Sequence, residues 1–431
     1  MQKMKFKNSG IDWIGKIPEH WKIDRLKDQA QIITGNTPPK SNPENYQDGT
    51  IPWIKPDSLR GGEVEDSEEK LTELGLKSAR LIPKNAILVG CIGDLGNYAI
   101  SGCELTTNQQ INSIIFNNSV EYRFGKYVII ASKSENWRLS TIVVVPILNK
   151  TRQGQIYLPL PLLPEQKAIA DYLDKACEKI DRVIELKKKQ LDKIDAYYKS
   201  RLHEAITKGL DESVSFKQSS ISWQGEVPAH WKKEKLYRLS DKMGSGGTPK
   251  SSNQEYYDGE IPWIQSGDLN DGILTKTKKT ITERGLNESS AKLFSKNTVL
   301  IAMYGATIGK LGKMGMDAAT NQACCAIQIS AKIDSDFLFY MLYNMREYLI
   351  SQGYGGGQSN ISQEVLKQQY FYFPEINEQR EIVKFIIKLQ NKSEAVKSNI
   401  SAQLLTIQEY RKSLIHECVT GKKKIAEYVQ S

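Results

Sequence analysis

One stretch of the sequence carries residues that could cleave a phosphodiester. Asp57 and Glu68-Glu69-Lys70 have the spacing of a metal-dependent nuclease site, in which carboxylates and a lysine converge on a metal ion. Such a site places its glutamate and lysine on an apolar strand, whereas residues 63–70 are predicted to form an acidic loop. The second half of the chain has no equivalent. We therefore predict neither a nuclease site nor a metal site.

Two glycine-containing stretches could in principle hold a phosphate. Gly305-Ala-Thr-Ile-Gly-Lys310 is one residue shorter than a phosphate-binding loop, and Leu311 stands where a Ser or Thr would bind Mg²⁺. Residues 90–96 match a dinucleotide-binding pattern even more weakly. No Asn-Pro-Pro-aromatic motif, which would hold a flipped base for amino methylation, is present. We expect the glycines to mark tight turns, and we predict no catalytic residue and no bound cofactor.

Histidines, tryptophans and cysteines could also act as ligands or nucleophiles. The four histidines form two matched pairs, His20 with His230 and His203 with His416, and none has a carboxylate or cysteine at ligand spacing. Six of the seven tryptophans are matched in the same way, which is typical of packing anchors. The six cysteines contain no Cys-x-x-Cys pair, so they indicate reduced thiols rather than disulfides or zinc ligands.

These matched residues belong to an internal repeat that spans the chain. Residues 9–21 return as 219–231, an offset of 210, and residues 202–207 return as 415–420, an offset of 213. A duplication of about half the chain predicts two similar domains with pseudo-two-fold character. Such a molecule suits a partner that is itself nearly two-fold symmetric, and duplex DNA is the obvious candidate.

Each half combines a globular stretch with a long helix. No Gly or Pro occurs from Glu165 to Lys208, and apolar residues recur there every three or four positions; Glu375–Thr420 repeats the pattern. A helix of this length spans about 65 Å at 1.5 Å per residue, so its apolar stripe requires a partner helix. The simplest closure is an antiparallel coiled-coil pair. The globular stretches contain short β-branched runs between Gly, Asn and Pro clusters, which predicts mixed α/β (α+β) domains.

These patterns give the domain boundaries. We predict a first globular domain over 1–163, a long helix over 164–210, a second globular domain over 211–373 that begins with a linker at 211–220, a second helix over 374–421, and a basic tail over 422–431. The 431 residues contain no apolar run long enough for a membrane span and begin with no apolar signal segment, which indicates a cytoplasmic protein. The net charge of +9 favours a polyanionic partner.

The repeated motifs resemble those of a known family, the specificity subunits of Type I restriction-modification systems. The match covers nearly the whole chain, in order and twice. The motifs are Trp-x-Gly-x-Ile/Val-Pro-x-His-Trp (13–21, 223–231), Gly-x-Thr-Pro (35–38) with Gly-Gly-Thr-Pro (246–249), Ile-Pro-Trp-Ile (51–54, 261–264), Thr-Asn-Gln (107–109, 320–322), Leu-Pro-Glu-Gln-x-x-Ile (163–169) with Asn-Glu-Gln-x-x-Ile (377–382), and the Leu/Ile-His-Glu-x-Ile/Val-Thr helix ends.

The resemblance implies a non-catalytic subunit with two target-recognition domains, each reading one half of a split double-stranded DNA site. The two long helices would set the spacing between the half-sites and provide a docking platform. Two DNA methyltransferase (modification) subunits that use S-adenosylmethionine to methylate adenine N6 would bind there. Restriction subunits that translocate DNA with ATP and Mg²⁺ would complete the enzyme.

Candidate DNA-binding residues lie in or near the glycine-rich turns of the two domains. Lysines there would contact phosphates, and polar side chains would contact base edges. The Gly-x-Thr-Pro loops could offer backbone N–H groups to a phosphate or could be ordinary turns. The candidates are Gly35, Thr37, Lys40, Gly246, Gly247, Thr248, Lys250, Lys276, Lys278, Lys279, Lys310, Lys313, Gln358, Ser359 and Asn360. Candidates for subunit docking or for structural roles are His20, Trp21, Glu165, Gln166, His203, His230, Trp231, Glu378, Gln379 and His416.

The two halves diverge most over 60–80 against 270–290 and over 117–150 against 330–360. If these segments read bases, the half-sites differ and the recognised sequence is asymmetric. Three alternatives remain open. The chain could be a self-sufficient methyltransferase or nuclease, or a coiled-coil adaptor that never binds DNA. It could also be the specificity subunit of a two-component system in which one partner both methylates and cleaves (Type IIB-like).

Overall fold

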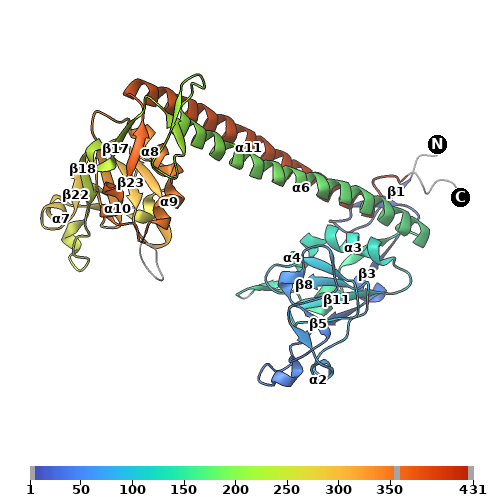
Figure 1. The fold of residues 1–431 in the computed structure, drawn as a ribbon. Coiled ribbons are helices and arrows are strands. Elements are labelled where there is room, and N and C mark those ends of the chain that lie inside the picture. The colour runs from blue at the N-terminus through green and yellow to red at the C-terminus, as the bar shows by residue number, and fades with distance from the viewer. Residues whose placement is uncertain (1–4, 143, 354–359, 426–431) are drawn as a thin grey trace. The chain divides into compact units, whose positions relative to one another are not determined.

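A computed structural model describes residues 5–142, 144–353 and 360–425. The chain packs into two compact units (Figure 1). Unit 1 comprises Met1–Lys187 with Ser401–Ser431, and unit 2 comprises Lys188–Ile400. Each unit therefore contains one globular domain together with half of each long helix, so the packing divides both helices between the units.

The domain of unit 1 is built on a five-stranded sheet of order β4-β11-β8-β9-β6 and a three-stranded sheet of order β10-β5-β7. Hairpin β1-β2 and the antiparallel pairs β3-β14 and β12-β13 complete it. The strands are β1 (Phe6–Asn8), β2 (Lys16–Pro18), β3 (Lys22–Arg25), β4 (Ala30–Thr34), β5 (Ile51–Ile54), β6 (Glu63–Val64), β7 (Lys70–Leu71), β8 (Ile87–Gly90), β9 (Tyr98–Ser101), β10 (Thr106–Thr107), β11 (Ile111–Phe116), β12 (Thr141–Ile142), β13 (Pro146–Ile147) and β14 (Tyr157–Leu160).

The domain of unit 2 repeats this plan with sheets of order β18-β26-β23-β24-β20 and β21-β19-β25-β22. Hairpin β15-β16 and the pair β17-β27 correspond to β1-β2 and β3-β14. The strands are β15 (Phe216–Gln218), β16 (Glu226–Pro228), β17 (Lys232–Lys235), β18 (Ser240–Ser245), β19 (Tyr257–Ile264), β20 (Gly272–Leu274), β21 (Lys279–Ile281), β22 (Lys292–Phe294), β23 (Val299–Ala302), β24 (Leu311–Met314), β25 (Ala318–Thr320), β26 (Cys324–Ile329) and β27 (Tyr370–Phe373).

The central strands of both five-stranded sheets are buried on two faces. In β8, Ile87 and Val89 pack into the core beside the helices, whereas Leu88 packs into a second core toward the smaller sheet. In β23, Val299 and Leu300 divide between two cores in the same way. Successive strand residues point to opposite faces, so an uninterrupted apolar run suits a strand that is covered on both sides.

Short helices pack on the strands of each domain. Helices α3 and α4 of unit 1 correspond in order to α8 and α9 of unit 2, and α2 corresponds to α7, although these segments barely align in sequence. Unit 1 contains α1 (Leu26–Gln29), α2 (Glu73–Leu76), α3 (Tyr122–Ala131), α4 (Lys133–Leu139) and α5 (Lys150–Gln153), and unit 2 contains α7 (Glu283–Asn287), α8 (Ser335–Asn344), α9 (Arg346–Ser351) and α10 (Gln363–Lys367).

The long helices are α6 (Leu163–Lys208) and α11 (Ile376–Val419). Both are slightly shorter than the predicted 164–210 and 374–421, although α6 begins one residue early and contains Pro164 in its first turn, where a missing N–H costs nothing. Helix α6 ends before Gly209, whose φ of +73° is a left-handed conformation that favours glycine.

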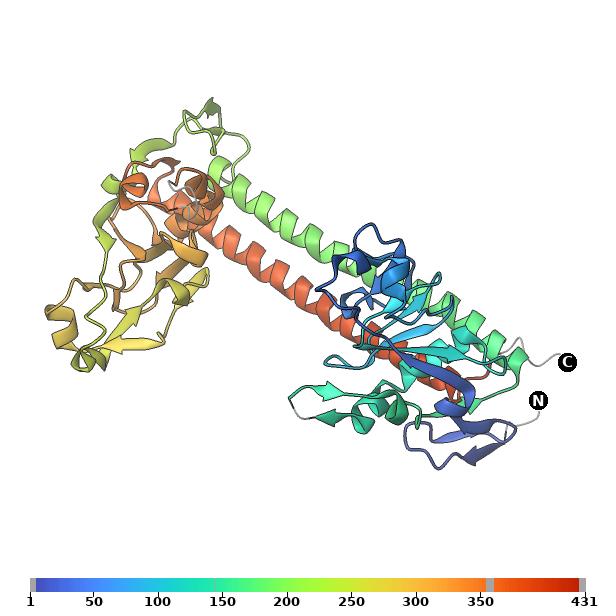
Figure 2. The ribbon, with the colours of Figure 1, turned by 90° about the horizontal axis from the view of Figure 1, so that it is seen from below.

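Within each unit the two helices run antiparallel (Figure 2). In unit 1, Arg411 of α11 pairs with Asp181 of α6, and in unit 2 Lys397 pairs with Asp195. The number of residues from Asp181 to Asp195 along α6 equals the number from Arg411 back to Lys397 along α11. The two ion pairs therefore have the same antiparallel register.

The predicted fold class, two α/β domains with a long antiparallel helix pair, is confirmed. Across the described residues, no helix combines the length and apolarity needed to cross a membrane.

Candidate nucleic-acid interface and helix junctions

A buried glutamine ties the start of each long helix to its domain. The carbonyl oxygen of Gln166 accepts from the backbone N–H of Glu121 at 2.8 Å, and its amide donates to the carbonyls of Ser119 and Pro161, each at 3.0 Å. Gln379 makes the equivalent three bonds, to Asp334 N–H at 2.8 Å and to the carbonyls of Lys332 at 3.1 Å and Pro374 at 2.8 Å. The amide oxygen and nitrogen of both glutamines are already hydrogen-bonded inside their own units. This favours a structural role for Gln166 and Gln379 over a role in subunit docking.

A histidine–glutamate contact lies beside each glutamine. His20 Nε2 is 3.0 Å from Glu165 Oε2, and His230 Nε2 is 2.9 Å from Glu378 Oε2. The indole of Trp231 donates to Glu378 Oε1 at 3.0 Å. Trp21 and Trp231 are at most 2% exposed, so they are packing anchors, whereas both histidine side chains are 48% exposed. The histidine edge of this junction is therefore accessible to a partner, and in unit 2 the Glu378 side chain is also 35% exposed.

The histidines at the helix ends also contact their own units. His416 Nε2 lies 2.7 Å from the carbonyl oxygen of Trp13, and the two rings meet edge to face with centroids 6.4 Å apart. His203 Nδ1 lies 3.3 Å from Asn344 Oδ1, and His203 is exposed. The end of α11 therefore docks on the domain of unit 1, and the end of α6 docks on that of unit 2.

The Gly-x-Thr-Pro loops pack against the Thr-Asn-Gln segments. Thr37 donates to Gln109, and Thr248 donates to Gln322 in the second copy. A Cβ on Gly246 would lie 1.8 Å from the carbonyl oxygen of Thr320, so only glycine fits there.

The backbone N–H groups of the glycines in these loops already donate hydrogen bonds within the domain. Gly35 donates to the carbonyl of Ile111 at 3.0 Å, and Gly247 donates to that of Thr320, also at 3.0 Å. Gly246 donates to the Thr320 hydroxyl at 3.2 Å. Of the two interpretations, phosphate-binding loop or ordinary turn, these bonds favour the turn.

The candidate lysines differ in their surroundings. The Lys313 side chain is only 11% exposed and is ion-paired with Asp336. Lys40 lies 3.6 Å from Glu69 and 5.9 Å from the centre of the Trp53 ring. The remaining candidates are exposed, and none has an ion pair with a described residue: Lys250, Lys276, Lys278, Lys279 and Lys310. Their charges are thus available to a polyanion.

Of the three polar candidates in the glycine run, Asn360 is exposed. Gln358 and Ser359 lie outside the described residues.

The motifs rejected as catalytic have ordinary structural explanations. Gly305–Thr307 forms a single 3₁₀ turn, in which Gly305 has a φ of +79°. Glu69, part of the nuclease-like spacing, is paired with Lys55 and Lys40. Among the described residues no cluster of three or more His, Cys, Asp or Glu side chains could hold a metal ion.

Burial raises the pKa of the Cys324 thiol to about 12, so this thiol is protonated at neutral pH.

The divergent segments occupy equivalent positions but carry opposite charge. Residues 63–70 connect β6 with β7 and contain five acidic side chains and one lysine. Residues 273–280 connect β20 with β21 and contain three lysines and no acidic side chain. The scaffold is therefore shared while the surface chemistry at this edge is reversed.

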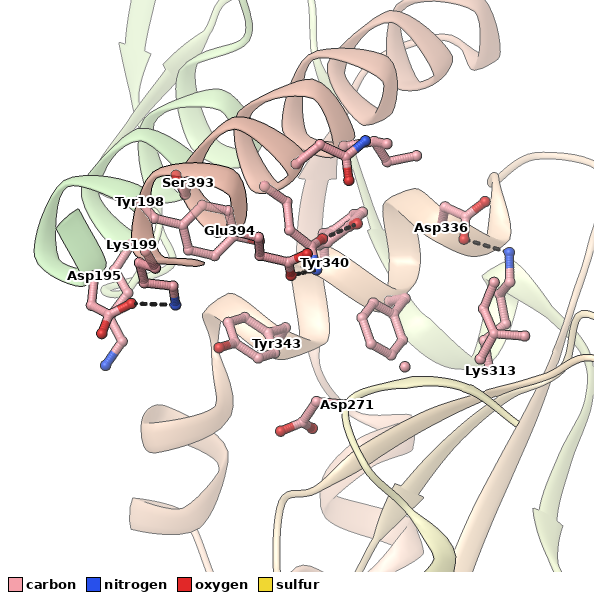
Figure 3. A pocket seen from close by; sticks show the side chains of 17 residues that line it. Asp195, Tyr198, Lys199, Asp271, Lys313, Asp336, Tyr340, Tyr343, Ser393 and Glu394 are labelled. Carbon is pink, nitrogen blue, oxygen red and sulfur yellow. Dashed lines mark hydrogen bonds and ion pairs between the residues drawn. The ribbon is translucent and has the colours of Figure 1, made fainter. Parts of the chain in front are cut away.

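Sequence reasoning missed a cleft of about 580 Å³ within unit 2, between the helix pair and the domain (Figure 3). Its wall includes Tyr198 of α6, Tyr340 and Tyr343 of α8, and Glu394 of α11. These residues come from three separate helices, and no local spacing links them. The repeat offset of 213 could have paired Tyr198 with Arg411 and Glu394 with Asp181, but it would not have revealed the cleft.

A sequence model of the family described as "Type I restriction modification DNA specificity domain" matches residues 18–196 and again residues 228–406. The chain belongs to this family. Both matched ranges begin at the proline of the Pro-x-His-Trp motif and extend well into a long helix, so the specificity domain includes part of the helix as well as the globular stretch.

Some curated members of the specificity family align with nearly the whole chain, and others with a part of it. The Type I restriction enzyme MjaIX specificity subunit of Methanocaldococcus jannaschii is 25% identical over 96% of both chains. The HindI specificity subunit of Haemophilus influenzae is 39% identical over 23% of this chain and 22% of its own length. One solved structure comes from work on the complex assembly and conformational transition of the type I R-M system. It superimposes with a TM-score of 0.74 at 17% sequence identity, and the match covers 94% of this chain and 99% of the solved chain. The HsdS subunit from Thermoanaerobacter tengcongensis gives 0.56 at 16% identity and covers 94% and 98%. This chain therefore has the same fold as these two solved structures.

Proposed function

We propose that this specificity-family chain is the non-catalytic DNA-recognition subunit of a Type I restriction-modification enzyme, and that it reads an asymmetric, two-part DNA site. Each globular domain reads one half-site. The helix pair sets the distance between the half-sites and provides the surface on which two DNA methyltransferase subunits assemble. Those subunits supply S-adenosylmethionine chemistry at adenine N6, and restriction subunits supply ATP- and Mg²⁺-dependent translocation and cleavage.

One observation carries the proposal: a single scaffold occurs twice and presents different surface chemistry at equivalent edges. The two five-stranded sheets have the same strand order, whereas the β6–β7 and β20–β21 connections carry opposite charge. Lysines approach phosphates and guanine acceptors, whereas carboxylates accept from the cytosine amino group. Domains that differ in this way favour half-sites of different sequence.

The exposed lysines of unit 2 support duplex DNA as the partner. Lys276, Lys278 and Lys279 lie within four consecutive residues and have no ion pair with described residues. Such a cluster neutralises phosphates and releases counterions, which gives an affinity that falls steeply with salt.

The deciding experiment is adenine-methylation mapping of DNA from cells with and without the gene. We expect one split motif, with an adenine modified in each half, to disappear when the gene is deleted. A chain carrying unit 1's domain from a relative should change only one half of that motif. An unchanged methylome, together with normal expression of the methyltransferase subunit, would contradict the proposal. Purification of the assembled complex would distinguish separate methyltransferase and restriction subunits from a single partner that both methylates and cleaves.

A further inference from the structure

The two units differ at one equivalent position of the helix pair. In unit 1, Arg411 reaches Asp181, with Nε 3.1 Å from Oδ1. The repeat offset of 213 places Tyr198 at the position of Arg411 and Glu394 at that of Asp181. Unit 1 therefore closes this contact with an arginine of its own, while unit 2 keeps the carboxylate and replaces the arginine with a tyrosine.

This difference lies at the cleft of unit 2 (Figure 3). Four carboxylates line the cleft. Three of them are ion-paired: Asp195 with Lys397, Asp271 with Arg346, and Asp336 with Lys313. The fourth, Glu394, accepts a hydrogen bond from the Gln390 amide at 3.0 Å, and no cation among the described residues forms an ion pair with it. The exposed Lys199 lines the cleft without reaching Glu394.

Glu394 is exposed at the cleft, and three tyrosines line the cleft with it: Tyr198, Tyr340 and Tyr343. The Tyr340 hydroxyl donates to Gln390 at 3.1 Å, and Gln390 in turn reaches Glu394. Burial raises the pKa of Tyr198, and the nearby Tyr340, Tyr343 and Glu394 raise it further. Tyr343 already accepts one cation, since the Arg346 guanidinium carbon lies 4.7 Å from its ring centre. Tyrosine faces attract cations, and the attraction increases when water is excluded.

We propose that this cleft receives an arginine or lysine side chain from a protein partner, with Glu394 as its counter-ion and Tyr198 and Tyr340 as its aromatic walls. The proposal rests on the proposed function, because the partner is the methyltransferase subunit that assembles on the helix pair. In unit 1 the carboxylate equivalent to Glu394 is Asp181, and it is already paired with a cation of the chain itself, Arg411. Unit 2 thus has a cation-binding site that the chain itself does not fill.

The charge of the cleft decides the class of partner. A DNA phosphate would be repelled by Glu394 and would find the cleft's Lys313 and Lys397 already paired with carboxylates. A purely apolar side chain would leave the Glu394 carboxylate desolvated without compensation, which is costly. A guanidinium or ammonium group satisfies both the carboxylate and the rings.

The first test variant supplies the cleft with a cation from the chain itself. Tyr198→Arg places an arginine where unit 1 has Arg411, so the variant should fold with at least wild-type thermal stability and should weaken binding of the methyltransferase subunit by about tenfold or more. Glu394→Gln removes the counter-ion and keeps the shape, and it should also weaken binding by about tenfold. The control is Tyr197→Arg, which adds the same charge at a side chain that is 57% exposed and outside the cleft.

Affinities are measured by titrating the full-length chain with the methyltransferase subunit encoded with it. Wild-type affinity in both cleft variants would overturn the inference and leave the proposed function intact. Failure of the wild-type chain to bind the subunit would instead count against the proposed function. A second measurement needs no partner: N-acetyl-arginine amide should shift the NMR signals of labelled tyrosine rings in the wild-type chain but not in Tyr198→Arg or Glu394→Gln. No shift in the wild-type chain at saturating probe would also overturn the inference.

Discussion

The side chain of Gln379, in the first turn of α11, accepts a hydrogen bond from the backbone N–H of Asp334 at a distance of 2.8 Å. Asp334 caps the start of α8 by accepting from the backbone N–H groups of Asp336 and Phe337. The glutamine therefore joins the start of a long helix to the start of a domain helix. Gln166 makes the equivalent bond to Glu121, which caps α3.

Removal of this glutamine should destabilise its own unit. Gln379→Ala leaves one backbone N–H and two carbonyls without their partner, and we expect the free energy of unfolding to fall by about 2–4 kcal/mol. Urea denaturation followed by tryptophan fluorescence measures the change. The control is Gln408→Ala on the exposed face of α11, which should stay within about 0.5 kcal/mol of wild type. Equal effects of the two substitutions would show that the buried hydrogen bonds contribute little.

The close approach of the Gly-x-Thr-Pro loop to the Thr-Asn-Gln segment predicts a strict requirement for glycine. A Cβ on Gly246 would lie 1.8 Å from the carbonyl oxygen of Thr320, so Gly246→Ala must displace backbone and should lower stability by about 2 kcal/mol or more. Gly267→Ala is the matched control, since a Cβ there meets nothing within 4 Å. Comparison of the two melting temperatures tests the prediction, and a Gly246→Ala protein as stable as Gly267→Ala would refute it.

The lysines of the β20–β21 connection should govern the salt dependence of DNA binding. The triple variant Lys276→Gln, Lys278→Gln and Lys279→Gln should bind all duplexes more weakly. The slope of log affinity against log salt should fall by up to about 0.9 for each phosphate that the variant no longer neutralises. Fluorescence anisotropy of the assembled complex at several salt concentrations measures this slope. Lys388→Gln on α11, at an exposed position, serves as the control. An unchanged slope in the triple variant would place this connection away from the phosphates.

The helix pair should set the spacing between the half-sites. Insertion of one helical turn into both α6 and α11 lengthens each by about 6 Å, the rise of roughly two base pairs. We expect the methylated motif to keep both half-sequences and to gain spacer. Substitution of the same exposed helix positions without insertion should leave the spacer unchanged. Methylation mapping measures both results. An unaltered spacer after insertion would show that the helix pair does not set the spacing between the half-sites.

Asp174 should contribute to the acid stability of unit 1. Burial opposes its charge, but hydrogen bonds from Lys126 and Tyr127 and the nearby Arg123 outweigh burial and lower its pKa below the ordinary 3.8. A lowered pKa stabilises the fold fully above the ordinary value, and this contribution is lost as the pH falls through the folded-state value. Asp174→Asn should therefore destabilise the protein at neutral pH and flatten its loss of stability in acid. Asp57→Asn, at an exposed position, is the control for urea titrations across this pH range.

The sequence by itself determined the elements, the repeat and the family. Apolar periodicity without Gly or Pro specified α6 and α11 to within a few residues, because a long amphipathic helix is encoded by contacts three and four residues apart. The alternation of apolar runs and turn residues likewise predicted strands such as β8 and β23, each of which is a run of four buried residues.

Only the tertiary structure decided which side chains are available. Lys310 immediately precedes β24 and Lys313 lies within it, yet Lys313 is paired with Asp336 of α8 while Lys310 is exposed. Sequence spacing does not encode that difference, since burial and ion pairing depend on contacts between distant segments. The cleft around Glu394 has the same origin: its walls include residues of α6, α8 and α11, which are distant in the sequence.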